Sequence, residues 1–350
     1  MKRLLSMFSL VFVLAAPSLA QERTLSVYGY FDLEYEVGNE NDAARRGSFD
    51  QHHFNVITSY VLDDHFRVLG EIEWEHGTEL AVGEGAGEVK LVRAWAEYRH
   101  ADGLKIRVGK FLPPYGIYNL RHDATPTFLS TFLPSSIYGN HLNPLGEEQR
   151  FYSKHATGIQ VLGSVPVRDW RVGYAAYVSN GRGETPFESD GNSNKGLGGR
   201  LTVLLPKRVA EIGTSFYTDR NGTAADTRQT FVGFDANIDI AGFNISGETT
   251  LGRLETVTGT MQPSGSFQNS LGAYGQLAYT LYDRVTPFAR YDFFDPNTGT
   301  SDDGEYHVTT GVNFSVTPRV YLKAEVHSVG FQQAGIDSYR LFVASIAVAF

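Results

Sequence analysis

Charged side chains recur at alternate positions in several separate stretches of this sequence. An acidic set occupies two of these stretches: Asp32, Glu34, Glu36, Glu71, Glu73 and Glu75. Alternate residues of an extended chain project to one face, so each stretch predicts a strand with one charged face and one apolar face. Strands of this kind suit a wall that separates lipid from water, with the charged faces lining the water.

A basic set lies on neighbouring stretches of the same pattern: Arg67, Arg93, Arg99, Lys105 and Arg107. Rings of charged side chains set ion selectivity in pores, so a cluster of this sign would attract anions. The alternative is that these side chains pair with Glu97, Asp123 or other carboxylates and hold a loop in place. A basic wall facing an acidic wall would also orient dipolar solutes, unless both walls are ordinary solvated faces.

The alternation stops at Pro113 and Pro114, and residues 112–153 show no strand or helix period. An irregular segment of this length within a compact fold is usually functional. We expect it to fold into the mouth of a barrel and to narrow a water-filled pore. Its charged residues are therefore candidates for a constriction: Arg121, Asp123, Glu147, Glu148 and Arg150.

The rest of the chain repeats one rhythm, in which short turns alternate with longer polar loops. Short turns are expected at 63–64, 100–103, around Pro166, and at 206–207, 241–242, 282–284 and 317–319. Counting the stretches gives about sixteen strands, and an even number of antiparallel strands with short turns at one rim is the layout of a transmembrane β-barrel. A barrel of this size is wide enough for an aqueous channel. The alternative is a soluble β-sandwich or solenoid, which would not need so many outward-facing aromatic residues.

The amino-acid composition narrows the class of protein further. A basic start, an apolar run and small residues up to Ala20 predict a secretory signal peptide over residues 1–20, which leaves 21–350 for an all-β barrel. No later apolar run is long enough for a spanning helix. The 19 Tyr, 23 Phe and 37 Gly suit strands that are apolar on alternate residues, and the absence of Cys excludes a disulfide framework. The formal charge of -9 argues against nucleic acid as a partner.

The C-terminal stretch 338–350 is β-prone and ends on an aromatic residue. An exposed apolar edge there would aggregate, so we expect it to pair with the first strand and close the barrel. It resembles the terminal signature of outer-membrane proteins, with apolar residues at alternate positions: Phe342, Ile346, Val348 and Phe350. This resemblance implies recognition by the barrel-assembly machinery of a Gram-negative outer membrane.

Several phrases resemble the outer-membrane porins of the phosphate-selective porin O and P family and their wider relatives. They are RVGKFLPPYG at 107–116 with Asn119 and Arg121 after it, WAEY at 95–98, PFARYDFF at 287–294 and GVNF at 311–314. The resemblance implies an outer-membrane homotrimer in contact with lipid and lipopolysaccharide, whose third external loop bends inward. Phosphate selectivity in that family goes with a concentration of Lys and Arg at the constriction, whereas 111–150 holds two Arg and three carboxylates. The resemblance therefore does not imply phosphate as the solute.

The sequence thus predicts a porin for passive diffusion of small hydrophilic solutes or ions, with anions as one candidate. A closed barrel that binds a surface partner and a barrel hydrolase are the alternatives, although G-x-S-x-G is absent and local motifs identify no Ser, His and acid set. A receptor with a plug domain is disfavoured because the first strand begins soon after Gln21.

We expect no enzyme activity, no cofactor and no metal site. His52 and His53 should point to opposite faces of a strand and so should not share a metal ion. Residues 295–303 have some features of a calcium loop but lack its terminal Glu.

Overall fold

The computed structural model describes residues 24–42, 44–76, 87–139, 151–182, 187, 189–222, 225–260 and 262–350. The expected signal peptide lies outside the described residues, as do Glu147, Glu148 and Arg150 of the irregular segment. The helices within these ranges are short, and none of them has the length and apolar character needed to cross a membrane.

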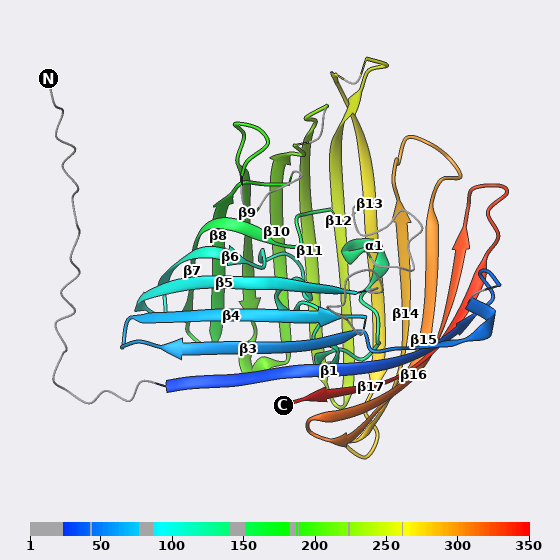
Figure 1. Cartoon of the computed structure of the whole chain (residues 1–350), viewed down its shortest axis with the longest axis horizontal. Helices are drawn as coiled ribbons and strands as arrows, with labels where there is room; N and C mark the ends of the chain where they lie inside the picture. Colours follow the sequence, from blue (N-terminus) through cyan, green and yellow to red (C-terminus); the bar gives the residue numbers. More distant parts are fainter. Residues whose placement is uncertain are drawn as a thin grey trace, which may run out of the picture.

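The described strands join into one antiparallel sheet that closes on itself (Figure 1). In chain order they are β1(Thr24–Gly38), β2(Ser48–Asp50), β3(His53–Val61), β4(Phe66–Glu75), β5(Glu88–Ala101), β6(Leu104–Phe111), β7(Ala156–Val167), β8(Trp170–Ser179), β9(Gly196–Leu204), β10(Ala210–Arg220), β11(Arg228–Ile240), β12(Phe243–Val257), β13(Pro263–Tyr279), β14(Val285–Asp295), β15(Glu305–Thr317), β16(Val320–Phe331) and β17(Tyr339–Ala349). Because β2 and β3 both pair with β1, they count as one interrupted strand. The expected barrel of sixteen antiparallel strands is therefore confirmed.

The first and last strands close the barrel, as the C-terminal pattern predicts. β1 pairs with β17 from Tyr30 opposite Ala349 to Gly38 opposite Leu341. Gly29 and Phe350 exchange two backbone hydrogen bonds of 3.0 Å each. Pairing at this seam leaves neither terminal strand with an open edge, so every backbone group there can be satisfied within the sheet.

The expected short turns lie where the chain reverses, with one correction. Pro166 does not form the turn between β7 and β8; it lies in β7 opposite Arg171. The reversal occurs at Arg168 and Asp169, and the φ of +56° at Arg168 supplies the sharp bend. Pro166 is therefore the second-last residue of β7, and the turn begins two residues after it.

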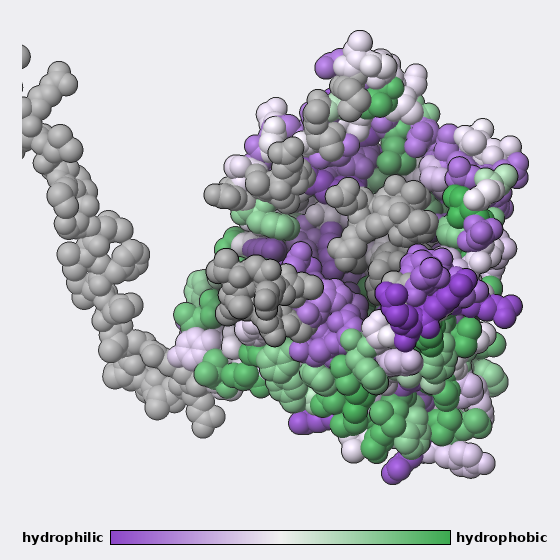
Figure 2. Space-filling model, turned by 45° about the vertical axis from the view of Figure 1, so that its right-hand side comes forward, coloured by the Kyte–Doolittle hydropathy of each residue, from purple (hydrophilic) through white to green (hydrophobic). Residues whose placement is uncertain are grey.

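Apolar side chains alternate with buried polar ones along each strand. On β10, Ile212 and Phe216 are exposed outward, whereas Ser215 and Asp219 are buried inside. Figure 2 shows the outward apolar residues gathered in a band on the lower half of the molecule, below a polar upper rim. This is the surface that a lipid bilayer requires of a barrel wall.

The described part of the connection between β6 and β7 lies inside the barrel and carries three short helices. It contains η2(Asn119–Arg121), η3(Thr125–Thr127) and α1(Ser135–Tyr138), and Figure 1 shows α1 enclosed by the strands. We call residues 112–139, the longer of its two described stretches, the inward segment. Its side chains, together with those of the inner wall, make the core of the molecule.

Candidate functional site: the inward segment and its charged chamber

The inward segment is bonded to the barrel wall far from its own strands. The hydroxyl of Tyr138 donates to both oxygens of Glu248 on β12, at 2.7 and 2.8 Å. The backbone N–H of Thr131 donates to Glu325 on β16 at 2.8 Å. The inward segment therefore reaches from β6 across the interior to β12 and β16.

Buried cations of the wall satisfy the backbone carbonyls of the segment. The ammonium group of Lys323 on β16 donates to the carbonyls of Thr125 and Ser130, at 2.7 and 2.9 Å. The guanidinium of Arg290 on β14 donates to the carbonyl of Phe132 at 3.0 Å. Irregular backbone inside a barrel must find such partners, and charged donors give the stronger hydrogen bonds.

Aromatic rings fill the interior on the side of β8 to β14. Tyr115 stacks on Tyr152 with ring centroids 4.2 Å apart, and the Tyr118 and Tyr138 rings meet edge to face at 5.7 Å. Burial raises the pKa of Tyr138, and the neighbouring Glu248 carboxylate raises it further. The hydroxyl of Tyr138 therefore stays protonated and serves as a donor.

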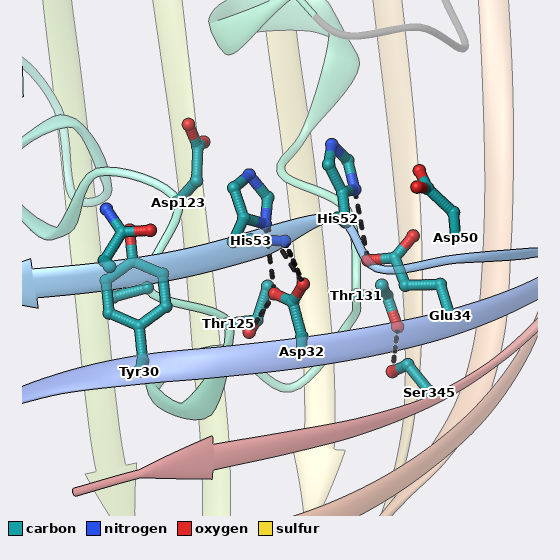
Figure 3. A network of polar contacts seen from close by, with 12 residues as sticks. Tyr30, Asp32, Glu34, Asp50, His52, His53, Asp123, Thr125, Thr131 and Ser345 are labelled. Carbon is teal, nitrogen blue, oxygen red and sulfur yellow. Dashed lines mark hydrogen bonds and ion pairs between the residues drawn. The ribbon is translucent and has the colours of Figure 1, made fainter. Parts of the chain in front are cut away.

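On the opposite side, a chamber of about 410 Å³ remains between the inward segment and the wall formed by β1, β3 and β4. Its lining combines four carboxylates, three histidines and part of the inward segment: Glu36, Asp50, His52, His53, Glu75, His76, Asp123, Thr125, Phe128, Thr131, Phe132, Leu133 and Gly139. Figure 3 shows several of these residues, with His52, His53 and Asp123 on the same side of β1. None of the described lining residues is Lys or Arg.

Beside the chamber, the carboxylate of Asp32 fixes the position of His53. A carboxylate oxygen of Asp32 lies 3.0 Å from Nδ1 of His53, and Asp32 also accepts the backbone N–H of His53 at 2.8 Å. The hydroxyl of Thr125 donates to the same carboxylate at 2.6 Å, which links the inward segment to β1 (Figure 3). Asp32 is fully buried, so these contacts fix both its position and the orientation of the imidazole.

A second buried carboxylate, that of Glu73, lies close to His53. Its Oε2 accepts a hydrogen bond from Asn55 at 2.8 Å and lies 3.3 Å from Nδ1 of His122. Asp123, the next residue of the inward segment, forms an ion pair of 2.8 Å with Lys154. The acidic set expected on β1 and β4 is thus brought together with the inward segment.

The prediction that His52 and His53 point to opposite faces is wrong. Their rings stack with centroids 4.0 Å apart, and His52 also stacks on His76 at 4.7 Å. Residues 51 and 52 interrupt the strand between β2 and β3, so the two-residue alternation does not hold there. Burial and the neighbouring His53 lower the pKa of His52, but its hydrogen bond with Glu34 and the charge of that carboxylate outweigh them and raise it.

The basic set forms cross-strand pairs with acidic residues of adjacent strands. Arg93 pairs with Glu71 at 2.5 Å, and Arg107 pairs with Glu97 at 2.7 Å. Arg67 lies 3.9 Å from Glu97. These pairings match the alternative in which the arginines are held by carboxylates, although the partners belong to the strands and not to the inward segment.

Two arginines of these pairs also lie over the aromatic ring of Trp95. The guanidinium carbons of Arg67 and Arg107 lie 5.0 and 4.1 Å from the centre of that ring. Arg99 pairs with Asp102 at the short turn, and Lys105 lies opposite Arg99 in the strand register. The acidic set on β1 and β4 and the basic set on β4 to β6 therefore occupy one side of the barrel, on the neighbouring strands from β1 to β6, and not two facing walls.

Arg121 of the inward segment lies apart from both charge sets. It is exposed, donates to the carbonyl of Thr127 at 3.3 Å and lies over the ring of Tyr118. The anchor residues of the far wall are ones that sequence reasoning did not select: Ser215, Glu248, Arg290, Asp292, His307, Asn313, Lys323 and Glu325. Each of these residues lies at an inward position of its strand, and the alternation of inward and outward positions is the sequence signal that could have identified them.

One Ser, His and acid grouping also occurs in the described chain. Ser135 Oγ lies 2.6 Å from Nδ1 of His307, and Nε2 of His307 lies 3.8 Å from Glu305. The second distance is too long for a hydrogen bond, and all three side chains are buried away from the chamber. The Ser135 contact anchors α1 to β15. No local motif reveals it because the residues are distant in sequence.

Comparisons with known proteins place this architecture in a family. Residues 6–333 match the model of a family described as Gram-negative porin. A curated relative, an uncharacterized protein of Aquifex aeolicus (strain VF5), is 26% identical over 160 residues, covering 46% of this chain and 33% of that protein. This chain thus matches about a third of the length of that relative.

Solved structures share the fold at low sequence identity. A loop L8 deletion mutant of the outer-membrane protein OmpT of Vibrio cholerae superposes with a TM-score of 0.65 at 12% identity, covering 94% of this chain and 100% of that one. An anion-selective porin from Comamonas acidovorans gives a TM-score of 0.65 at 11% identity with the same coverage. With a family match over most of its length and a closed sixteen-stranded barrel, the chain belongs to the Gram-negative porins.

Proposed function

We propose that this porin passes small hydrophilic solutes and ions by passive diffusion, with the inward segment as its constriction and with a preference for cations. The observation that carries the preference is the lining of the chamber, which has no Lys or Arg among its described residues and has four carboxylates. Two of them, Glu75 and Asp123, are paired with Lys90 and Lys154, so Glu36 and Asp50 supply most of the excess negative charge. A surface dominated by one sign of charge concentrates ions of the opposite sign.

The charges of the basic set do not oppose this preference strongly. Arg93 and Arg107 lie within 2.5 and 2.7 Å of carboxylates, so each pair presents little net charge to the lumen. The Comamonas porin is described as anion-selective, but its 11% identity to this chain carries no information about selectivity. We therefore replace the anion candidate of the sequence analysis with a cation preference.

Planar-bilayer recordings of the purified protein test both parts of this proposal. We expect stepwise conductance and, in a KCl gradient, a zero-current potential that is positive on the dilute side, since K⁺ would cross more readily than Cl⁻. The opposite sign would reject the cation preference while leaving conduction intact. Absence of steps, together with no swelling of sugar-loaded liposomes, would favour the closed surface-binding barrel instead.

We further propose a homotrimer that contacts outer-membrane lipid and lipopolysaccharide and reaches the membrane after cleavage of residues 1–20. One OmpT structure of Vibrio cholerae is described as a trimer form, which supports the proposal by analogy of fold. A heat-modifiable band at three times the monomer mass in mild detergent is expected. Sequencing of the mature N terminus tests the cleavage site, and deletion of Phe350 tests recognition by the barrel-assembly machinery.

We also propose that the protein has no catalytic activity. The Ser135, His307 and Glu305 grouping is buried, and its acid lies 3.8 Å from the imidazole. Esters presented to the purified barrel should therefore be hydrolysed no faster than in its absence. A rate above that background would revive the hydrolase alternative.

A further inference from the structure

We propose that His53, Glu73, Glu75 and Asp123 form a binding site for a divalent transition-metal ion of the Zn²⁺ class. Each residue offers one ligand atom, and these atoms all lie within 4.8 Å of one another. The residues come from β3, from β4 and from the inward segment. Binding at this group requires only the chamber geometry, so it goes beyond the proposed conduction and does not depend on it.

The imidazole of His53 is already oriented as a metal ligand would be. Asp32 lies 3.0 Å from Nδ1 of His53, which assigns Nε2 to the ligand role. Asp32 is in turn held by the hydroxyl of Thr125 at 2.6 Å. A carboxylate behind a histidine is the usual outer partner in metal sites, where it fixes the tautomer and the direction of the ring.

Glu73 supplies an independent indication that this group of residues binds a cation. Its side chain is fully buried, and Oε2 accepts a hydrogen bond from Asn55 at 2.8 Å. Oε1 is equally inaccessible, yet it has no hydrogen-bond partner among the described residues. A buried carboxylate oxygen without a partner is costly, and a bound cation at this group would satisfy it.

Two lysines already lie beside the other carboxylates. Lys90 contacts Glu75 at 2.5 Å, and Lys154 contacts Asp123 at 2.8 Å. A carboxylate has lone pairs for more than one partner, so an ammonium group and a metal ion can share it. The lysines would also reduce the excess negative charge of a site with three carboxylates and one divalent ion.

The donor set selects the class of ion. Zn²⁺ accepts imidazole nitrogen together with carboxylate oxygen, whereas Ca²⁺ and Mg²⁺ favour oxygen alone. A neighbouring group, Asp50, His52 and His76, also has ligand atoms within 4.8 Å of one another. The His52–His53 stack joins the two groups, with rings 4.0 Å apart. Imidazoles at this density favour a transition metal over an alkaline-earth ion.

Isothermal titration of the full-length, detergent-folded protein with ZnCl₂ tests the site. We expect saturable binding, with CaCl₂ and MgCl₂ at least about tenfold weaker because they gain little from the imidazole. His53→Gln and Glu73→Gln should each weaken Zn²⁺ binding at least about tenfold, and Asp32→Asn should weaken it by about 10–100-fold through loss of orientation. His100→Gln, at an exposed position of β5, is the matched control and should bind Zn²⁺ as the parent does.

Several results would overturn the assignment. They are the absence of Zn²⁺ binding, equal affinity for Ca²⁺, or unchanged binding in both His53→Gln and Glu73→Gln. Loss of binding in His76→Gln alone would move the site to the neighbouring group. Heat-modifiability on gels verifies that each variant is folded, and if a wall variant fails this check, Asp123→Asn in the inward segment decides the question. Bilayer recordings on the same samples report conduction separately, so failure of one proposal is distinguishable from failure of the other.

Discussion

The hydroxyl of Tyr138 lies 2.7 and 2.8 Å from the two carboxylate oxygens of Glu248, across the barrel from the strand where the inward segment begins. Glu248 also accepts a hydrogen bond from Tyr274 at 2.6 Å. Two phenol donors thus meet one buried carboxylate. The end of the inward segment is fixed at this contact.

Tyr138→Phe should loosen that end of the segment. The substitution keeps the ring but removes a donor from a buried carboxylate, a loss of about 1–3 kcal/mol. Hydrogen exchange of the peptides covering 112–139 should become faster, and open-channel current noise should increase. Tyr282→Phe, at a turn residue that is 91% exposed, serves as the control. Equal exchange in parent and Tyr138→Phe would show that the aromatic packing alone holds the segment.

Lys323→Met should release the middle of the inward segment. It leaves the carbonyls of Thr125 and Ser130 without their charged donor, and hydrogen bonds to charged groups contribute about 1.5–3 kcal/mol. We expect faster exchange around 125–133 and a larger or more variable single-channel conductance. Lys207→Met, in an exposed short turn, should change neither quantity. A parent-like exchange rate would contradict the anchoring role.

Alkaline pH should destabilise the packed state of the segment. Burial raises the pKa of Tyr115, Tyr118 and Tyr138 above the usual tyrosine value of about 10. Groups whose pKa is raised on folding contribute stability that is complete below the unfolded pKa and is lost as pH rises through the folded pKa. Ultraviolet absorbance should show these phenols titrating above pH about 10, later than exposed tyrosines. Tyr138→Phe should remove one late-titrating group.

Ion selectivity should respond to the chamber carboxylates. Glu36→Gln combined with Asp50→Asn removes two of the four carboxylates that line the chamber, so the K⁺ over Cl⁻ preference should fall. Asp302→Asn, in an exposed loop, is the control with a matched change of chemistry. An unchanged reversal potential in the double variant would place the selective step elsewhere in the pore.

Arg107→Glu tests the paired role of the basic set. The parent guanidinium lies 2.7 Å from Glu97 and 2.9 Å from the side chain of Gln160. Reversing its charge places two carboxylates together, so the reversal potential should shift toward cations and thermal unfolding should occur at a lower temperature. A shift in potential with unchanged stability would indicate that Arg107 acts on ions without supporting the wall.

The alternation of apolar and polar residues along each strand made the barrel predictable from sequence. It identified the strands, their water-facing charges and the closing C-terminal strand, because a strand with one lipid face and one water face imposes a period of two. The turn between β7 and β8 was expected around Pro166, because proline gives the stronger turn signal, and the left-handed backbone occurs two residues later, at Arg168.

The chamber was less predictable because it depends on contacts that a periodic pattern does not encode. His52 and His53 lie together only because two residues interrupt the strand before β3. Asp123 reaches the wall residues through the path of an irregular segment, and Lys323 meets Thr125 across nearly two hundred positions of sequence. Within unbroken strands the face of a residue could be assigned from sequence, but its partner across the lumen could not.

The seam between β1 and β17 also has a kinetic consequence. It joins Tyr30 to Ala349, so the first strand cannot acquire its final neighbour until the last residues of the chain have been delivered. Contacts between such distant positions form slowly because a long stretch of chain must be ordered first. A chain shortened before β17 would retain two unsatisfied edges, at β1 and β16, and should accumulate as an assembly intermediate that proteases can reach.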